Sequence, residues 1–315
     1  MKLPIPGLTS HFSIAVLLLA SFLPAIQAHA LQLAPAQVAP GVYAFIGETG
    51  MRTYENEGMN ANAGFIVTKA GVVVIDSGPT YQVAKAIHAA IKKVTQQPVK
   101  YVINTGAQDH RWLGNGYFKE QGAQIIASRK ARADMEERGA GQLAGLTSEL
   151  REKINGTRAV YPERLFDQKE ILKLDTEEIQ ILFFQGGHTP GDAVVWIPKS
   201  RTLFSGDLIY VDRLLGVLPF SNSKNWLASF EAIGKLKPKV VIPGHGKVCD
   251  WAKAQSETGD YLALLRKHMR KAIDAGNELQ KAINTLDQSA YRNLEMFELL
   301  KGGNASRVYL EMEVE

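Results

Sequence analysis

Apolar residues in the first half of the chain alternate between short continuous runs and helical periodicity. Residues 71–75 read Gly-Val-Val-Val-Ile and precede Asp-Ser-Gly, which predicts a strand buried on both faces. From residue 80 to residue 95, apolar residues recur at helical spacing and predict an amphipathic helix. Further strands are expected at residues 41–46, 64–68, 99–104 and 123–127. This order of strands and helices predicts a layered α/β fold.

The second half returns to strands and then becomes helical. Residues 130–155 predict a helix, although Gly139, Gly141 and Gly145 weaken its middle. Residues 252–301 predict mainly helices, and the next strand signal comes only at Val308. Strands are expected at residues 179–184, 193–198, 202–205 and 239–243, with a helix over residues 225–236.

The first thirty residues have the layout of a secretory signal peptide. Lys2 gives a positive start, and the apolar core of residues 12–26 is shorter than the roughly 20 residues of a membrane span. Ala-His-Ala at residues 28–30 then offers a small-residue cleavage site. We therefore expect a periplasmic or secreted protein that begins near Leu31 and has no membrane span after cleavage. The alternative is an uncleaved N-terminal anchor.

Charge and cysteine content narrow the function classes. The formal net charge is only +4, and no run of five Lys or Arg residues occurs, so we expect no nucleic-acid partner. Cys249 is the single cysteine, which excludes a disulfide within the chain and favours a packing role for the thiol. The length fits one domain over residues 31–250, followed by a helical segment, residues 251–315, that packs on it.

Histidine and aspartate residues stand in glycine-rich loops at the ends of the expected strands. His188 lies in Gly-Gly-His-Thr-Pro-Gly-Asp, His245 lies in Pro-Gly-His-Gly, and Asp207 follows Ser-Gly. A third loop, Asn-Thr-Gly-Ala-Gln-Asp-His-Arg-Trp-Leu-Gly-Asn, contributes Asp109 and His110. Loops at one edge of a sheet converge, so these residues form a candidate metal site. A set of imidazoles and carboxylates suits zinc, with iron or manganese as alternatives.

Several residues near these motifs have two interpretations. Arg111 either enters the cavity, where it pairs with Asp207 and holds an anionic substrate, or lies outward on a first helical turn. Residues 206–219 are either an apolar wall facing the substrate, with Arg213 as an anion contact, or ordinary core. Trp112 is expected to pack in the interior. His88 and His268 are expected to be solvated residues on helices.

The order of the motifs resembles the metallo-β-lactamase superfamily. The resemblance spans residues 38–250 and begins with Ile-Asp-Ser-Gly at residues 75–78. It implies a four-layered αββα sandwich with one or two metal ions at one rim, followed here by C-terminal helices that pack back or mediate oligomerisation. On this pattern His188 matches a ligand of the first metal, Asp207 the bridging carboxylate, and His245 a ligand of the second metal.

The loop over residues 104–115 departs from the family pattern Asn-Thr-His-x-His-x-Asp-His-x-x-Gly-Asn. A shift by one residue places Asp109-His110 on the family's Asp-His, but the two upstream histidines remain absent. The first site then keeps His188 alone, whereas the second keeps enough ligands for one zinc ion. Aligned without gaps, the four ligand positions hold Gly106, Gln108, His110 and Arg111.

We therefore expect an exported, mononuclear zinc hydrolase that attacks a lactam, lactone, ester or thioester carbonyl of a small-molecule substrate. Asp109 would orient or deprotonate the attacking water, His188 would line the pocket, and Arg111 would act on the substrate. One alternative is a non-catalytic binding or accessory protein of a periplasmic pathway on the same scaffold. Another is redox or sulfur chemistry with iron in place of zinc.

Overall fold

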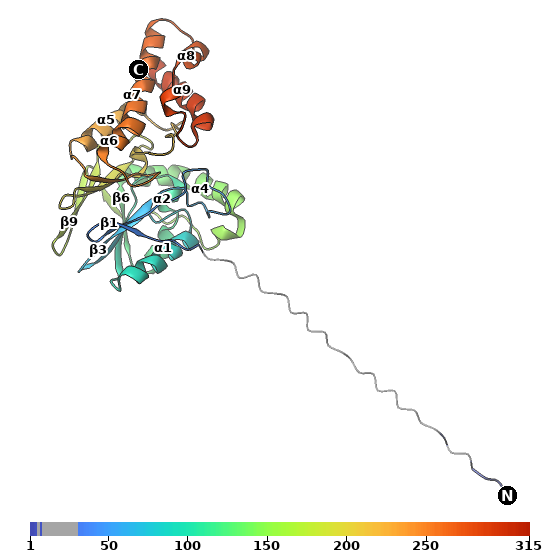
Figure 1. Cartoon of the computed structure of the whole chain (residues 1–315). Helices are drawn as coiled ribbons and strands as arrows, with labels where there is room; N and C mark the ends of the chain where they lie inside the picture. Colours follow the sequence, from blue (N-terminus) through green and yellow to red (C-terminus); the bar gives the residue numbers. More distant parts are fainter. Residues whose placement is uncertain (5–6, 8–30) are drawn as a thin grey trace. The chain divides into compact units, whose positions relative to one another are not determined.

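The computed structural model describes residues 1–4, 7 and 31–315, so most of the predicted signal peptide lies outside the described residues. Contacts divide the chain into two units, Met1–Ala30 and Leu31–Glu315, and the description below concerns the second unit (Figure 1). Among the described residues, no helix has the length and apolar character needed to cross a membrane.

Two mixed sheets lie at the centre of this unit (Figure 1). In the first sheet the strands follow chain order, antiparallel up to the fourth strand and parallel from there on. Its strands are β1 (Ala36–Ala39), β2 (Val42–Phe45), β3 (Ala63–Thr68), β4 (Gly71–Ile75), β5 (Val99–Ile103), β6 (Gln124–Ser128) and β7 (Arg164–Phe166).

The second sheet is antiparallel except for its β11–β12 pair, and its strand order is β12-β11-β10-β9-β8. Its strands are β8 (Lys169–Leu174), β9 (Glu177–Phe183), β10 (Ala193–Ile197), β11 (Thr202–Phe204) and β12 (Val240–Ile242). The sequence pattern missed three strands, β1, β7 and β8. Charged residues alternate with apolar ones along β8, which is an edge strand, so its apolar signal is weak.

Helices cover both outer faces of the paired sheets (Figure 1). The α-helices of the first half are α1 (Tyr81–Val94), α2 (Asp109–Trp112), α3 (Asn115–Glu120) and α4 (Arg129–Leu150). Those of the second half are α5 (Ser223–Gly234), α6 (Trp251–Ala254), α7 (Asp260–Asp274), α8 (Leu279–Thr285) and α9 (Phe297–Glu313). Short helical turns lie at Arg151–Ile154, Gly206–Leu208, Gln255–Gly259 and Ser289–Tyr291.

Strand β4 shows how the sequence specifies the four layers. Val73 and Ile75 belong to the core between the two sheets, whereas Val72 and Val74 pack with residues of α1 on the outer face. Because alternate residues of a strand point to opposite faces, a run of four apolar residues is buried on both sides. A third core joins the second sheet to the C-terminal helices. The predicted αββα sandwich with C-terminal helices is therefore confirmed.

Helix α1 follows its predicted bounds closely. Thr80 is the N-cap residue, and its hydroxyl accepts a hydrogen bond of 3.1 Å from the backbone N–H of Val83. The prediction for His88 is wrong: its side chain is buried, with Nδ1 2.9 Å from the Tyr117 hydroxyl. Helix α3 packs against α1 there, and a helical residue between two apolar neighbours gives no sign of that contact.

Two further expectations about helices can be compared with the structure. Val308 lies inside α9 and is buried, so the expected strand signal there is wrong. Helix α4 is continuous despite its three glycines. A Cβ atom at Gly139 would lie 3.0 Å from the ring of Trp112, so this glycine lets the helix approach a buried indole. Trp112 is fully buried, which confirms its packing role.

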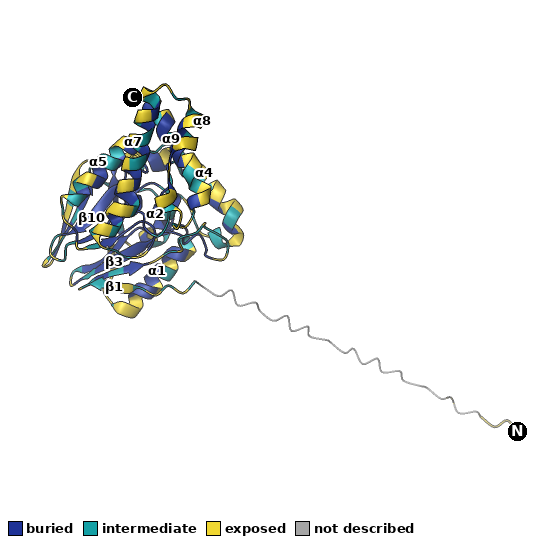
Figure 2. Ribbon diagram, turned by 45° about the horizontal axis from the view of Figure 1, so that its top comes forward, coloured by how far each residue is buried: buried dark blue, intermediate teal, exposed yellow. Residues whose placement is uncertain are grey.

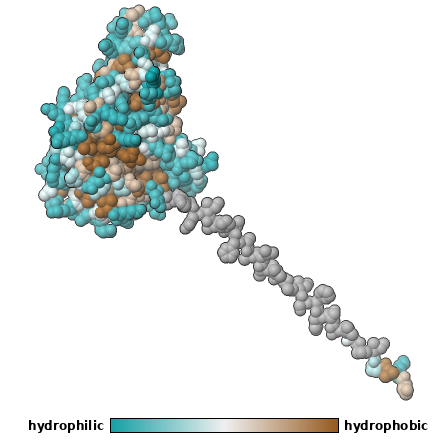
Figure 3. Space-filling model, in the orientation of Figure 1, coloured by the Kyte–Doolittle hydropathy of each residue, from teal (hydrophilic) through white to brown (hydrophobic). Residues whose placement is uncertain are grey.

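The C-terminal helices pack on the outer face of the second sheet. Figure 2 shows α7 and α9 with one buried and one exposed face, as expected for helices on a core. Asn304 of α9 joins them to the loop after β11: its Oδ1 accepts from Val217 N and its Nδ2 donates to Leu215 O, both at 2.7 Å. The view in Figure 3 shows hydrophilic residues over the ends of these helices and hydrophobic residues near the middle of the visible face.

Candidate metal centre

Three ligand-type side chains converge where strands of the two sheets end. His110 lies in α2, shortly after β5, whereas Asp207 follows β11 and His245 follows β12. One ligand-type atom from each residue lies within 4.8 Å of the other two, and all three residues are buried or nearly so. Carboxyl ends of strands meet at one edge of an α/β fold, so the topology itself assembles this trio.

The carboxylate of Asp207 lies between the two imidazoles. His110 Nε2 is 3.1 Å from Asp207 Oδ2, and His245 Nε2 is 3.2 Å from Asp207 Oδ1. The imidazole rings are nearly perpendicular, with centroids 5.3 Å apart. Two imidazole nitrogens and a carboxylate oxygen that face one another form a donor set suited to zinc.

The hydrogen bond of His245 determines which ring nitrogen is protonated. Its Nδ1 is 2.7 Å from the carbonyl oxygen of Asn60, which can only accept, so Nδ1 carries the proton. Burial lowers the pKa of His245 to about 3, so the ring is neutral near pH 7. The Nε2 lone pair therefore faces a carboxylate oxygen at 3.2 Å, an arrangement that repels unless a cation lies between them. The residues present thus fit a metal ion.

Asp109 supports His110 from outside the trio. Its Oδ1 accepts a 2.8 Å hydrogen bond from His110 N and is 3.4 Å from His110 Nδ1, while Oδ2 binds the guanidinium of Arg52. Burial opposes ionisation of Asp109, but the hydrogen bond from His110 and the charge of Arg52 outweigh it and lower the pKa to about 2. A carboxylate behind Nδ1 fixes the ring with Nε2 directed at a metal.

Arg111 points inward, beneath Asp207, and its side chain is only 1% exposed. All five of its N–H donors are used. They reach Asp207 Oδ1 (2.6 Å), Asp207 Oδ2 (3.1 Å), Asp76 Oδ2 (3.0 Å), Asn62 O (2.8 Å) and Gly244 O (3.1 Å). The outward alternative is therefore wrong and the expected pairing with Asp207 is present. No N–H remains to hold a substrate.

The charges around the trio leave a deficit of positive charge. Two guanidinium groups, those of Arg52 and Arg111, are paired with the carboxylates of this cluster. Three buried carboxylates surround them, those of Asp76, Asp109 and Asp207. With neutral imidazoles the cluster carries one net negative charge, which a bound cation would neutralise.

His188 lies beside the trio and does not belong to it. Its Nδ1 is 3.0 Å from the carbonyl oxygen of Gly216 and so donates, which leaves Nε2 as an acceptor. The ring packs at 5.3 Å from the indole of Trp226 and at 5.8 Å from the phenol of Tyr210. Burial lowers the pKa of His188 to about 4, so this residue is a neutral lining group.

Asp192 occupies the side of the site where the family's first metal ligands are missing. A Cβ atom at Gly106 would lie 2.6 Å from Asp192 Oδ1, so no larger residue fits at position 106 without moving this carboxyl. Thr189 donates to it from its backbone N–H and contacts it through its hydroxyl. Burial raises the pKa of Asp192 to about 8, so the carboxyl is mostly protonated at neutral pH.

Tyr210 is a residue of the site that the sequence pattern did not single out. Its ring stacks on His245, with centroids 4.6 Å apart and planes 13° from parallel. Burial and the nearby charge of Asp207 raise its pKa well above the ordinary value, so the phenol stays protonated. Its position three residues after Asp207, inside an apolar loop, was the available signal.

Arg213 lies in the same loop and has no acidic partner among the described residues. Its Nη1 donates to the carbonyl oxygen of Gly50 at 2.9 Å, and its buried Nε has no hydrogen-bond partner in the part of the chain that the structure describes. Burial lowers the pKa of this guanidinium. Cys249 lies apart from these groups, and burial raises the pKa of its thiol to about 12.

Comparison with known proteins gives consistent matches over most of the chain. The family model "Metallo-beta-lactamase superfamily" matches residues 57–245. "Metallo-beta-lactamase type 2" of Elizabethkingia meningoseptica is 30% identical over 71% of this chain and 82% of its own length. "Metallo-beta-lactamase IND-1" of Chryseobacterium indologenes is 26% identical over 65% of this chain and 77% of its own.

Solved structures share the fold of residues 31–315. A metallo-beta-lactamase from Pontibacter korlensis superimposes with a TM-score of 0.61 at 23% identity, over 74% of this chain and 99% of that one. The DIM-1 metallo-beta-lactamase superimposes with a TM-score of 0.59 at 19% identity, over 74% and 98% of the two chains. At these identities the likeness concerns the fold alone.

Proposed function

Because the chain belongs to the metallo-beta-lactamase superfamily and carries a buried His-Asp-His trio, we propose that this hydrolase is exported and holds one zinc ion. Its reaction is hydrolysis of a lactam, lactone, ester or thioester bond in a small molecule. The observation that carries the proposal is the neutral Nε2 of His245 facing the carboxylate of Asp207 at 3.2 Å, which calls for a cation.

A single ion fits this chain better than two. His110, Asp207 and His245 provide three ligands for one site and leave a position open for water. On the other side, Gly106 and Gln108 stand at two ligand positions of the family pattern, and the carboxyl of Asp192 fills the space beside Gly106. His188 remains there as a lining residue.

When bound, the zinc ion would supply Lewis-acid activation of a water molecule and of the substrate carbonyl. The protein's own groups then have distinct roles. Asp109 and Arg111 act as positioning residues, because the atoms of Asp109 are engaged by His110 and Arg52 and all donors of Arg111 are used. His188 accepts a proton at Nε2, and the phenol of Tyr210 donates a hydrogen bond to a substrate oxygen.

Arg213 supports a substrate that carries an anionic group. A buried guanidinium without an acidic partner is costly unless a ligand compensates its charge. Arg213 lies in the loop that carries Asp207, and its Nε has no hydrogen-bond partner among the described residues. Removal of this charge by Arg213→Met should raise KM more than it lowers kcat, whereas Arg213→Lys should keep part of the affinity.

Metal analysis tests the proposal directly. We expect about one zinc per chain in the purified protein and its loss in His245→Ala and His110→Ala, since a three-ligand site rarely survives removal of one ligand. Hydrolysis of lactams, lactones and thioesters should disappear in the same variants. Iron in place of zinc would support the redox alternative. A native protein that stays metal-free when zinc is supplied would overturn the hydrolase mechanism.

Export is tested by the N-terminus of the protein recovered from its own host. Mass spectrometry should find a chain that begins near Leu31 in the periplasmic or extracellular fraction. A retained N-terminus in the membrane fraction would favour the uncleaved anchor.

One observation favours a second candidate function, a non-catalytic binding protein on the same scaffold. The trio is closed to solvent, with side-chain exposures of 9% for His110, 0% for Asp207 and 3% for His245. A protein that binds zinc stoichiometrically but hydrolyses no member of the substrate panel, even after prolonged incubation, would support this alternative over the enzyme.

A further inference from the structure

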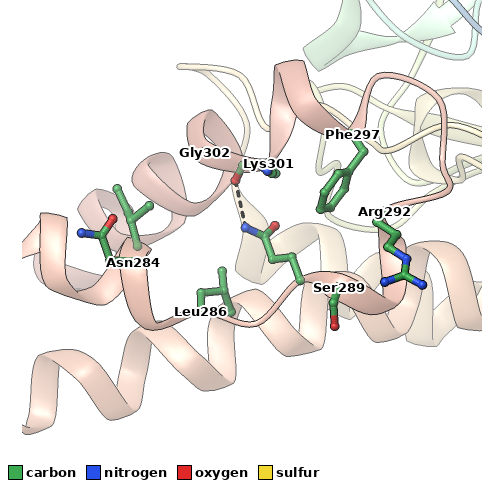
Figure 4. Close-up of a pocket in the computed structure, with 9 residues that line it drawn as sticks. Asn284, Leu286, Ser289, Arg292, Phe297, Lys301 and Gly302 are labelled. Carbon is green, nitrogen blue, oxygen red and sulfur yellow. Dashed lines mark hydrogen bonds between the residues drawn. The ribbon is translucent and has the colours of Figure 1, made fainter.

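A cavity of about 450 Å³ lies among the C-terminal helices, and none of its lining residues belongs to the candidate metal centre (Figure 4). It is bordered by the end of α8, the segment 286–296 and the beginning of α9. Its volume falls in the range of roughly 300–1,000 Å³ that is typical of small-molecule sites. The cavity is therefore large enough for a compact organic ligand.

The apolar part of the cavity is held in place by the protein core. Leu286 and Phe297 are 8% and 7% exposed and belong to the core between the second sheet and the C-terminal helices. Figure 4 shows the ring of Phe297 extending from the start of α9 toward the opposite segment. The site for an apolar group is thus formed before any ligand arrives.

Hydrogen bonds fix the polar part of the cavity. The hydroxyl of Tyr261 donates to Gln288 Oε1 at 2.8 Å, and Gln288 Nε2 is 3.4 Å from the carbonyl oxygen of Lys301 (Figure 4). Both ends of this amide are engaged, so it serves as a fixed wall. Ser289 also lines the cavity and offers a hydroxyl to a ligand.

The charged residues of the lining make the cavity positive. Arg292 forms no ion pair and no side-chain hydrogen bond with the residues that the structure describes, whereas the Lys301 ammonium is 2.7 Å from the exposed Glu298 and 4.9 Å from the Phe297 ring centroid. Two cations against one exposed carboxylate leave an excess of one positive charge. An apolar floor beside an unpaired guanidinium suits an amphipathic anion.

We propose that this cavity binds a small carboxylate that carries an apolar or aromatic tail. The tail lies against Phe297 and Leu286, and the carboxylate accepts hydrogen bonds from Arg292. The proposal does not depend on the reaction at the metal centre, because the two sites share no residue.

Isothermal titration calorimetry of the purified protein with three probes of one shape tests the charge preference. Phenylbutyrate should bind with a Kd on the order of 1 mM, the value expected for a ligand of its size. Phenylbutanol should bind at least about fivefold more weakly and phenylbutylamine not measurably, because only the carboxylate compensates Arg292. Equal affinity for the alcohol, or no heat with any probe, would overturn the proposal.

Two neighbouring glycines of α9 provide a matched pair of variants that tests the location. A Cβ atom at Gly302 or at Gly303 meets no other atom within 4 Å, but only Gly302 lines the cavity. Gly302→Leu should weaken phenylbutyrate binding more than about tenfold by filling the space, and Gly303→Leu should leave it unchanged. Binding that persists in Gly302→Leu and is lost in His245→Ala would place the ligand at the metal centre and refute the cavity site.

Discussion

His110 and His245 each hold one ring nitrogen against a protein acceptor and turn the other toward Asp207. The acceptors differ: a carboxylate supports His110, whereas a backbone carbonyl supports His245. The carboxylate partner makes His110 the more basic of the two, because Asp207 and Asp109 raise its pKa against the opposing effect of burial. At this scale the centre depends on partners that hold the ligands as much as on the ligands themselves.

Asp109→Asn should lower zinc affinity about 10- to 100-fold, the usual cost of losing a carboxylate behind a metal-binding histidine. The amide keeps the shape of the side chain but loses the charge that orients His110. Competition with a chromophoric chelator measures the change. Asp134→Asn is the matched control, since Asp134 is another buried aspartate paired with an arginine, on α4 and away from the centre. Equal losses in both variants would argue against a role for Asp109 at the metal.

Asp192 makes the metal-free protein lose stability as pH rises. Its pKa is about 8 in the folded chain against an ordinary 3.8, so between these values the unfolded chain is ionised while the folded chain keeps the proton. The unfolded state then binds fewer protons, and the free energy of unfolding falls as pH increases from about 4 to about 8. Asp192→Asn should flatten this part of the profile in denaturant titrations. An unchanged slope would show that Asp192 ionises normally.

Among the helices and strands, short apolar runs and cap residues gave most of the correct bounds. Strand β4 and helix α1 were predictable because their apolar spacing matches one structure and because Thr80 marks the helix start. Strand β8 was missed because it lies at a sheet edge, and His88 was placed wrongly because only packing of α3 on α1 buries it. Local patterns thus predict elements well and their neighbours poorly.

Thr80→Ala should destabilise the protein by about 1 kcal/mol, the typical contribution of an N-cap side chain. The hydroxyl of Thr80 satisfies the backbone N–H of Val83, and alanine leaves that donor without a partner at a buried helix start. Thr80→Ser keeps the oxygen and should restore most of the stability. Chemical denaturation of the three proteins measures the difference, and a serine variant as weak as the alanine variant would rule out the capping explanation.

For the molecule as a whole, the main question is how the C-terminal helices relate to the site. Asn304 bonds to both sides of the loop after β11, and the segment before α9 pairs with the same loop through Leu214 N to Glu295 O at 2.9 Å. This loop carries Asp207, Tyr210 and Arg213. The helices therefore hold one wall of the site, although their own sequence contains none of the candidate ligands.

Asn304→Leu should cost roughly 2–4 kcal/mol, because two buried backbone groups lose their partners. The replaced bonds are those to Val217 N and Leu215 O. If the helices position the loop, kcat/KM should also fall in the part of the protein that remains folded. Asn284→Leu, on the exposed side of α8, is the control. Full activity and stability in Asn304→Leu would show that the loop is held without α9.

The sequence by itself determined the layered α/β class, the C-terminal helices and the residue types of a metal centre. These features depend on local periodicity and on motifs at strand ends, which short-range physics governs. Only the tertiary structure decided which motif residues meet. It placed His110 with Asp207 and His245, left Asp109 and His188 outside the trio, turned Arg111 inward, and brought Asp192 beside Gly106. Those outcomes depend on side-chain direction and on contacts between residues far apart in the chain, which spacing along the sequence does not specify.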